Sequence, residues 1–399
     1  MLNSPYLSPW PHFEADEIAV ATATLQTGQV NYWTGDLGKQ FEHAYAKYVG
    51  QPFGIALSNG TVALELALRA LGIGVGDEVI VASRSYVASA SCVMQVGANP
   101  IFADLEPLSG NISALTIAPL ITHKTKAIIP VHVGGWPCDM PAIMQLANKH
   151  HLKVIEDCAQ AHGAMVAGKQ VGSFGDAAIF SFCQDKIIST GGEGGMLLLQ
   201  DEATYKRAWA YKDIGRSYDA VYNREHPAGF RWMTESAGSN FRMTEFQAAI
   251  GLRQLTKLDD WVNRRNAIAN AWVEALQAFD FIEVSPFSSN PNQRHARYRL
   301  YAQVKQNALV AGLQNIALRD KVIELLNAAS VPCFVGSCAE IYREKLFTNL
   351  QSKPQQRLPV AQFYADNVFC LLTHHTITPA QVDAQKIAIS KALSQLEKA

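Results

Sequence analysis

The chain has 399 residues, of which 48% are hydrophobic and 17% charged, so it can bury a large core and form a large and a smaller domain. Its 34 basic and 35 acidic residues give a formal net charge of -1, which excludes strong attraction to nucleic acid or a membrane surface. The N-terminal segment lacks a signal-peptide pattern, and no uncharged apolar run approaches the roughly 20 residues that span a bilayer. We therefore expect a cytoplasmic protein.

The cysteines give no sign of a disulfide framework. There are seven of them, an odd number, and none forms a CxxC pair. Buried free thiols are the simpler interpretation.

From about residue 52 to 200, apolar strand-like runs such as EVIVAS, AIIPVHV and LKVIEDCA alternate with helical patterns. This alternation predicts an α/β fold with a mainly parallel sheet covered on both faces by helices. In such sheets, ligands bind outside the carboxyl ends of the strands. The loops that follow these strands are therefore where a functional site is expected.

The second half of the chain has a different pattern. Apolar spacing over residues 244–278, without Gly or Pro after Gly251, predicts one long helix. Beyond it, strand-like YRLYAQV and helical LRDKVIELLNAA predict a smaller α+β unit. We expect a large domain over residues 1–255 and a small C-terminal domain over residues 256–399, linked by the long helix.

The first candidate site follows a short strand in IALSNGTVALELALRAL, where Asn59, Gly60 and Thr61 precede a periodic helix. Free backbone N–H groups and the helix dipole make such a start suitable for a phosphate group. A capped helix without a ligand is the alternative interpretation. Because the loop lacks both GxGxxG and GxxxxGK, it favours an isolated phosphate over a dinucleotide or a nucleoside triphosphate.

Two further strands are followed by residues with possible functions. Tyr86 follows EVIVAS, where its ring could stack on a flat cofactor, although a core tyrosine is an equal alternative. The strand LKVIED ends in Asp157, whose carboxylate could pair with a protonated pyridine nitrogen. For Asp157 alone, capping of a following helix is the more common explanation. His162 is expected to be a hydrogen-bonded structural histidine.

Lys186 lies in a loop after the apolar run AAIFSF and just before a cluster of glycines. A primary amine can form an imine with an aldehyde, and a partly desolvated site would lower its pKa and favour the nucleophilic form. The glycines allow the backbone to approach a planar ligand closely. A lysine that only faces solvent is the alternative interpretation.

Taken together, these segments resemble one known family. The landmarks are SNGTVALELALRALGIGVGDEVIV, VHVGGWPCDM, VIEDCAQAHGA, GDAAIFSFCQDKIISTGGEGGM, GSNFRMTEFQAAIGLRQLTKLD and SCAEIYREKLF with LPVA. In content and order they are similar to the DegT/DnrJ/EryC1/StrS family of nucleotide-sugar aminotransferases, which depend on pyridoxal 5'-phosphate. The resemblance implies an aspartate-aminotransferase fold (fold type I) with a seven-stranded sheet, and a homodimer with active sites at the subunit interface.

The resemblance also implies roles for individual residues. Lys186 matches the lysine that binds the cofactor through an imine, Asp157 the partner of the pyridine nitrogen, and Gln160 the residue near the ring hydroxyl. The remaining cofactor contacts implied are Gly60, Thr61 and Ser181 at the phosphate, Tyr86 stacked on the ring, and Asn240 at the neighbouring subunit's phosphate.

By this resemblance, the enzyme takes an amino group from an amino acid, usually L-glutamate, and gives it to a nucleotide-linked keto-sugar. One branch of the family has histidine in place of the lysine and dehydrates the sugar, and Lys186 excludes that branch because histidine cannot form the imine. Open alternatives are an aminotransferase with a non-sugar acceptor, and an inactive regulatory or scaffolding protein of the same fold.

For each candidate substrate contact, a packing or surface role is an equal alternative. The candidates are Tyr32, Trp33, Trp136, Arg216, Tyr218 and Tyr342. No metal site is expected. The adjacent His374 and His375 would point to opposite faces of a strand and could not share an ion.

Overall fold

The computed structural model describes residues 9–227, 234–287 and 292–398. Among these residues, the largest sheet has seven strands in the order β1-β9-β8-β5-β4-β2-β3. Neighbouring strands from β3 to β8 are parallel, whereas β9 is antiparallel to both β8 and β1. The strand bounds are β1 Phe53–Leu57, β2 Glu78–Ala82, β3 Asn99–Ala103, β4 Thr125–Ile129, β5 Lys153–Asp157, β8 Ala177–Ser181 and β9 Gly195–Leu199.

Helices α2 and α3 pack against β1, α3 also packs against β8 and β9, and α6 packs against β5. Every residue of β8 and β9 is buried, which explains why these strands read as continuous apolar runs and not as alternating ones. The helices up to α8 are α1 Ala15–Thr27, α2 Leu37–Val49, α3 Gly60–Ala70, α4 Ala88–Gln95, α5 Ala114–Ile117, α6 Met140–Lys149, α7 Glu202–Lys212 and α8 Tyr218–Tyr222. A short hairpin of β6 Met165–Val166 and β7 Lys169–Gln170 follows β5.

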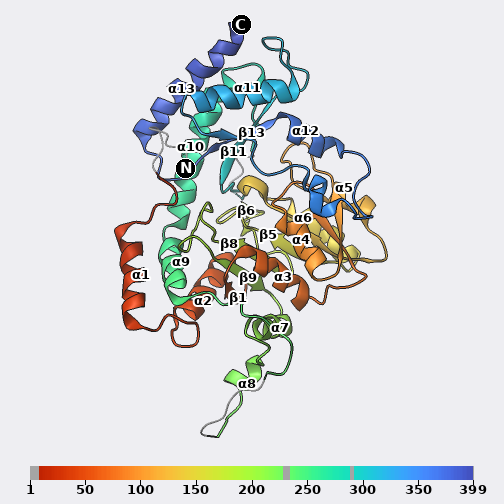
Figure 1. Ribbon diagram of the computed structural model, residues 1–399, viewed down its shortest axis with the longest axis vertical. Helices are drawn as coiled ribbons and strands as arrows, with labels where there is room; N and C mark the ends of the chain where they lie inside the picture. Colours follow the sequence, from red (N-terminus) through yellow and green to blue (C-terminus); the bar gives the residue numbers. More distant parts are fainter. Residues whose placement is uncertain (1–8, 228–233, 288–291, 399) are drawn as a thin grey trace.

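The C-terminal part has its own four-stranded sheet, in the order β10-β11-β13-β12, which lies with α11 and α13 above the larger sheet in Figure 1. Its strands are β10 Ile282–Glu283, β11 Arg299–Val304, β12 Cys333–Phe334 and β13 Val368–Leu372. Its helices are α11 Asn315–Ala328, α12 Pro359–Asn367 and α13 Pro379–Glu397. The predicted mainly parallel seven-stranded sheet and the smaller α+β part are thus confirmed.

Two hydrophobic cores correspond to the two sheets, and α10 (Leu258–Gln277) contributes to both. Its first turns place Leu258 and Val262 in the larger core, and its later turns place Ile268 and Trp272 in the smaller one. Residues from further along the chain, such as Tyr342 and Phe347, return to the larger core. The domain boundary at residue 255 stays a prediction.

The prediction of one continuous helix over residues 244–278 is wrong in detail. The structure has α9 Glu245–Leu255 and α10 Leu258–Gln277, separated at Thr256 and Lys257. The Thr256 hydroxyl donates to the carbonyl of Arg253, and the N–H of Lys257 donates to Gln254 three residues back. Local bonds of this kind compete with the helical pattern, so the break needs neither Gly nor Pro.

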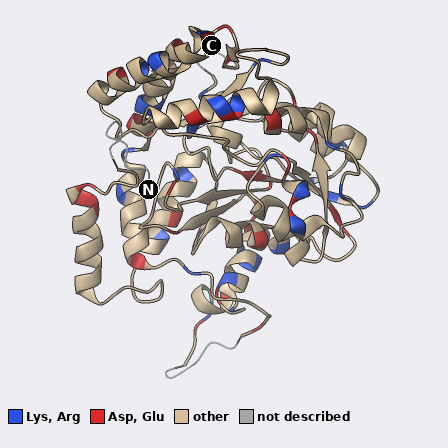
Figure 2. Ribbon diagram, turned by 45° about the horizontal axis from the view of Figure 1, so that its top comes forward, with Lys and Arg blue, Asp and Glu red and all other residues tan. Residues whose placement is uncertain are grey.

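All seven cysteines are free, but not all are buried as expected. Cys338 is exposed and Cys183 is half-buried. Acidic and basic residues are interspersed along the outer helices in Figure 2, in keeping with the balanced net charge. Within the described ranges, no helix is both long and apolar enough to cross a membrane.

Candidate active site

A cleft of about 700 Å³ lies at the carboxyl ends of β2, β5 and β8. We call residues 85–87, 157–160 and 181–186 the cleft floor, because they directly follow or end these strands. We call residues 298–299 and 336–346 the cleft wall. They come from the start of β11 and from the segment after β12, and they contribute Tyr298, Arg299, Ser337 and Lys345 to the lining.

Lys186 is brought to the cleft by a turn after β8, with its side chain 16% exposed. Its Nζ lies 3.0 Å from Oδ1 of Asp185 and 5.2 Å from the centre of the Tyr298 ring. Burial alone would lower the pKa of the amine, but Tyr298 and Asp185 outweigh it and raise that pKa above its ordinary value. The expected lowering of the Lys186 pKa is therefore wrong for the chain by itself.

Asp157 ends β5 and is buried. Its Oδ2 accepts from the hydroxyl of Ser89 at 2.9 Å, and the Ser89 hydroxyl is 2.7 Å from that of Ser85, which lines the cleft. Burial raises the pKa of this carboxyl, and among the described residues it has no ion-pair partner. The chain after Asp157 forms a turn, not a helix, so the helix-capping alternative is wrong.

Gln160 links the cleft floor to the cleft wall. Its Oε1 accepts from the N–H of Gly134 at 2.7 Å, and its Nε2 donates to Ser337 at 3.4 Å. His162 is buried, with Nδ1 2.7 Å from the Tyr45 hydroxyl and Nε2 2.9 Å from the Ser181 carbonyl. The structural role expected for His162 is confirmed.

The candidate phosphate loop is the start of α3. The Oδ1 of Asn59 accepts from the N–H of Val62, which leaves the N–H groups of Gly60 and Thr61 as those able to bind an anion. Ser181 lies directly beside this turn, since a Cβ added to Gly60 would be 2.9 Å from that of Ser181. The residues predicted at the phosphate are thus brought together.

Asn240 is exposed on a segment that runs next to this loop. The carbonyl of the adjacent Phe241 accepts from the N–H of Ser58 at 2.9 Å, and Arg242 pairs with Leu57. Its predicted role toward a second subunit stays a prediction.

Four candidate substrate contacts gather around Asp213, near α7 and α8, and do not line the cleft. The indole of Trp33 donates to Asp213 at 3.2 Å, and the guanidinium of Arg216 lies over the Trp33 ring. Tyr218 packs edge-on against Trp209. Tyr32 is 2% exposed, and its hydroxyl donates to Glu42, so a packing role is the one supported by its surroundings.

The other two candidates also lie outside the cleft lining. Trp136 is half-buried against Phe287 and His295, on the wall of a different cavity of about 610 Å³. Tyr342 is 1% exposed and donates to Glu340, so its burial leaves no surface for a substrate.

Three buried side chains could suggest a metal site: His132, Glu156 and Cys158 have donor atoms within 4.8 Å of one another. The Glu156 carboxylate, however, accepts N–H groups from Gly172, Phe174 and Gly175, and both ring nitrogens of His132 have partners. Hydrogen bonds therefore account for this group.

The expected placement of His374 and His375 on a strand is wrong. Both follow the end of β13, and His375 stacks on Trp261 at 4.0 Å between ring centres.

The residue-by-residue reasoning missed Asp185, Tyr298, Arg299 and Ser337, which all line the cleft. Asp185 could have been noticed as the neighbour of Lys186. Tyr298 and Arg299 begin a strand that was recognised only as a strand, and nothing local indicates that this strand starts at the cleft.

Comparison with known proteins gives consistent matches. The family model of the DegT/DnrJ/EryC1/StrS aminotransferase family matches residues 11–388. A GDP-perosamine synthase from Caulobacter vibrioides is 41% identical over 268 residues, covering 64% of this chain and 69% of that protein. A UDP-N-acetyl-3-dehydro-alpha-D-glucosamine 3-aminotransferase from Acidithiobacillus ferrooxidans is 34% identical, covering 89% and 88%. The X-ray structure of an aminotransferase from Psychrobacter cryohalolentis matches with a TM-score of 0.94 at 44% identity, covering 98% and 99%.

Proposed function

Because the chain belongs to the DegT/DnrJ/EryC1/StrS aminotransferase family, we propose that it transfers an amino group from L-glutamate to a nucleotide-linked keto-sugar. The product is an amino-deoxysugar for a surface polysaccharide or another glycosylated product. The observation on this chain that carries the proposal is Lys186 in the floor of a cleft, close enough to the buried Asp157 for its charge to act on the pKa of that carboxyl. The names of the two sugar-nucleotide relatives support the acceptor class.

Members of this family bind pyridoxal 5'-phosphate. When bound, it supplies an aldehyde that takes up an amino group and a ring that withdraws electrons from the donor's Cα. The cleft floor fits this group, because Asp157 is a buried carboxylate held by Ser89 and the N–H of Ala159 but by no cation among the described residues. A protonated ring nitrogen would provide the missing positive charge and keep Asp157 ionised.

The rest of the floor supplies contacts to the other parts of the same group. Gly60, Thr61 and Ser181 would hold the phosphate, Tyr86 would stack on the ring, and Gln160 would lie near the ring hydroxyl. These roles rest on the family resemblance and on the position of the five residues around the carboxyl ends of the strands.

Lys186 has two tasks in this proposal. Its amine would hold the cofactor covalently, and when free it would take a proton from, or return one to, the donor's Cα. Asp185, hydrogen-bonded to Nζ at 3.0 Å, keeps the ammonium oriented into the cleft. Tyr298 donates in turn to Asp185, which fixes the carboxylate between the two.

We also propose a cytoplasmic homodimer. Tyr86 lines the cleft and is nevertheless 69% exposed, and Asn240 is exposed beside the phosphate loop, so a second subunit on this face would cover both. Seven free cysteines are in keeping with a reducing compartment. Sedimentation at micromolar concentration should give twice the chain mass, and a monomer would contradict the shared site.

The reaction is tested by absorbance and peptide mapping. The purified protein should be yellow and should bleach on addition of L-glutamate, and borohydride reduction should leave a pyridoxyl group on Lys186. Lys186→Ala should abolish both, whereas Lys126→Ala, at an exposed position on β4, should change neither. Glutamate-dependent turnover of Lys186→Ala at the wild-type rate would defeat the assignment.

The acceptor is tested separately with keto-sugars linked to GDP, UDP or dTDP. NMR of the product would show whether the amine is added at carbon 3 or carbon 4. If the protein reacts with glutamate but aminates only non-sugar keto acids, the sugar acceptor is wrong while the cofactor chemistry stands.

A further inference from the structure

The segment 336–346 of the cleft wall has little regular structure of its own. It contains the short 3-10 turn η3 Ile341–Arg343 and the start of η4 Lys345–Phe347, yet it supplies Ser337, Cys338, Ile341 and Lys345 to the cleft lining. Its shape must therefore be set by contacts with its surroundings. These contacts converge on one buried carboxylate, that of Glu340, which is 5% exposed.

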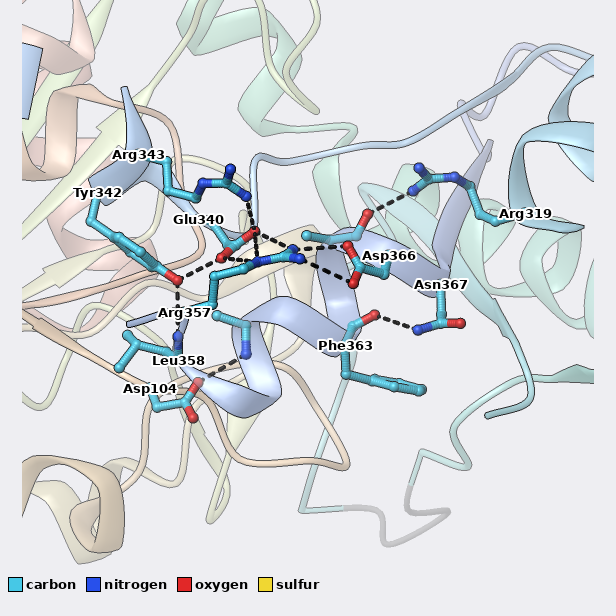
Figure 3. A network of polar contacts seen from close by, with 12 residues as sticks. Asp104, Arg319, Glu340, Tyr342, Arg343, Arg357, Leu358, Phe363, Asp366 and Asn367 are labelled. Carbon is cyan, nitrogen blue, oxygen red and sulfur yellow. Dashed lines mark hydrogen bonds and ion pairs between the residues drawn. The ribbon is translucent and has the colours of Figure 1, made fainter. Parts of the chain in front are cut away.

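Arg357 holds Glu340, and its two shortest hydrogen bonds to this carboxylate run from Nε to Oε1 at 3.0 Å and from Nη2 to Oε2 at 2.6 Å. Nη2 of Arg357 also donates to Asp366 on α12 at 2.8 Å. Figure 3 shows Arg357 between the two carboxylates, with Tyr342 donating to Glu340 from the other side. We call Glu340, Arg357 and Asp366 the wall clamp. A bidentate ion pair of this kind fixes the relative orientation of the two side chains as well as the distance between them.

The wall clamp acts on the same stretch of backbone that meets the cleft floor. On one side of Glu340, the carbonyl of Cys338 accepts from Ser85 at 3.1 Å, and on the other, the N–H of Ile341 donates to Ser83 at 2.9 Å. Ser85 precedes Tyr86 in the floor. If the clamp is released, the segment loses its side-chain ion pairs and is held at the edge of the floor by these two backbone hydrogen bonds.

Lys345 is the residue of this segment that can bind an anionic ligand in the cleft. It is exposed, lines the cleft, and has no ion-pair partner among the residues that the structure describes. A cation at that position can meet a phosphate group of a ligand lying in the cleft. The cleft, at about 700 Å³, is also far larger than an amino acid requires, so room along the wall remains for a nucleotide-linked substrate.

We propose that the wall clamp is a positioning device for the acceptor: it holds segment 336–346 so that Lys345 binds the diphosphate of the nucleotide-linked sugar. This rests on the proposed function. Arg357 itself does not line the cleft, so it acts through the segment. The amino donor depends instead on the cleft floor, whose residues are fixed by the strands. Loss of the clamp should therefore affect the acceptor and spare the donor.

The experiment compares Arg357→Gln with Arg343→Gln as a matched control. Arg343 is the other arginine on Glu340, but its single contact is 3.3 Å long and its side chain is 55% exposed. The two half-reactions are followed separately by absorbance of the bound cofactor, first with L-glutamate and then, on the amino form, with the keto-sugar.

For Arg357→Gln, the acceptor half-reaction should lose about tenfold or more in kcat/KM through a higher KM, because misplacement of a binding wall costs that much. Its donor half-reaction should stay within about twofold of wild type, as should both half-reactions of Arg343→Gln, since exposed pairs contribute little.

A binding measurement without turnover tests Lys345. Isothermal titration with UDP and with GDP should show weaker binding, by about fivefold or more, of the preferred nucleotide to both Lys345→Ala and Arg357→Gln. The first variant removes the cation that binds the diphosphate, and the second releases the segment that positions this cation. Arg343→Gln should bind like wild type.

Equal losses in the two half-reactions of Arg357→Gln, or none in either, overturn the proposal. If Arg357→Gln does not fold, Asp366→Asn takes its place, because it weakens the clamp and keeps both bonds between Arg357 and Glu340. In that case, an acceptor half-reaction of Asp366→Asn at the wild-type rate overturns the proposal. If the proposed function itself is wrong, the result is distinguishable, because the absorbance of the wild-type protein would not change when glutamate is added.

Discussion

The floor and the wall of the cleft are built in different ways. The floor consists of residues that end or directly follow strands of the seven-stranded sheet, and its buried carboxylate, Asp157, is bridged to Val131 within that sheet. The wall comes from the C-terminal part, and outside β11 it is held by side-chain ion pairs around Glu340 and by backbone hydrogen bonds to Ser83 and Ser85. The rigid part therefore carries the proposed chemistry, and the part that depends on a few side chains faces the acceptor.

This difference has a physical consequence. A strand end in a buried sheet can move only with its neighbours, because backbone hydrogen bonds and packing hold it on both sides. A segment held by a clamp can be repositioned by changing one or two side chains. Enzymes of one reaction type that differ in acceptor can vary in the wall without disturbing the floor, and variants of the floor should harm every step.

The largest effect is expected from Asp157→Asn. The substitution keeps the shape of the side chain and the bond from Ser89 but removes the charge opposite the cofactor ring. Both half-reactions should slow by roughly 10²–10³-fold, since a buried charge aimed at the reacting system contributes about that much. Single-turnover absorbance with glutamate and with the keto-sugar measures each rate.

Ser89→Ala is the graded control for Asp157, because it removes one hydrogen bond to the carboxylate and leaves the charge. Both half-reactions of Ser89→Ala should slow by about tenfold. If Asp157→Asn slowed only the acceptor step, the contrast between floor and wall would be wrong.

A smaller effect is expected from Gly60→Ala in the phosphate loop. The added Cβ would lie 2.9 Å from that of Ser181, so one of the two must shift at the place where the phosphate is to be bound. The affinity for pyridoxal phosphate should fall by about tenfold. Titration of the dialysed protein with the cofactor measures it.

Gly74→Ala is the matched control, because a Cβ there would lie 3.7 Å from its nearest neighbour, the carbonyl of Val96. Its cofactor affinity should equal that of wild type. Equal affinities for Gly60→Ala and Gly74→Ala would place the phosphate elsewhere.

The floor could be predicted from the sequence because its residues are adjacent to the strands that place them. Strand ends are recognisable from apolar runs, and the carboxyl ends of parallel strands share one edge, so the apolar pattern places the loops that carry Tyr86 and Lys186 at one edge of the sheet. The role of Gln160 came from the family resemblance. What local reasoning could not give was the charge balance there. The positions of Tyr298 and Asp185 beside the Lys186 amine depend on side-chain directions, and together these two residues raise the pKa of Lys186 where a lowering was expected.

The wall could not be predicted in this way. Tyr298 and Arg299 reach the cleft only because β11 joins a second sheet that packs against the first, and no local pattern encodes that docking. The aromatic substrate candidates could not be decided from the sequence for a related reason. Tyr32 and Tyr342 are of a residue type that is common at binding surfaces, but aromatic side chains are equally common in cores. Only the fold decides whether such a residue binds a substrate or packs in the core.

Tyr32→Phe sharpens this last point. The hydroxyl of Tyr32 donates to Glu42 and accepts from the indole of Trp209, both buried, so its removal should lower the free energy of unfolding by about 1–3 kcal/mol. Both KM values should stay at the wild-type level. Urea unfolding and steady-state kinetics give the two quantities.

Tyr48→Phe serves as the control for Tyr32, because its hydroxyl donates to the exposed Asp259 from a half-buried position. It should cost under about 1 kcal/mol, since water can replace the partner. A raised acceptor KM with unchanged stability in Tyr32→Phe would restore the substrate contact.

The smallest effect concerns the seam between the two cores, where His375 stacks on Trp261 of α10. Burial, with smaller contributions from Arg265 and His374, lowers the pKa of His375 from 6.5 to about 2. The unfolded chain binds this proton below pH 6.5 and the folded chain does not. The neutral histidine therefore contributes stability that is present above pH 6.5 and is lost as the pH falls toward 2.

His375→Phe keeps an aromatic ring on Trp261 and removes the titrating group, whose Nδ1 is buried without a hydrogen-bond partner in the described structure. The loss of stability between pH 7.5 and pH 5 should shrink by roughly 2 kcal/mol relative to wild type. Urea unfolding at the two pH values measures it, with exposed His43→Phe as the control. An unchanged pH dependence in His375→Phe would mean that this histidine reaches solvent, and that the seam between the two cores opens without unfolding either.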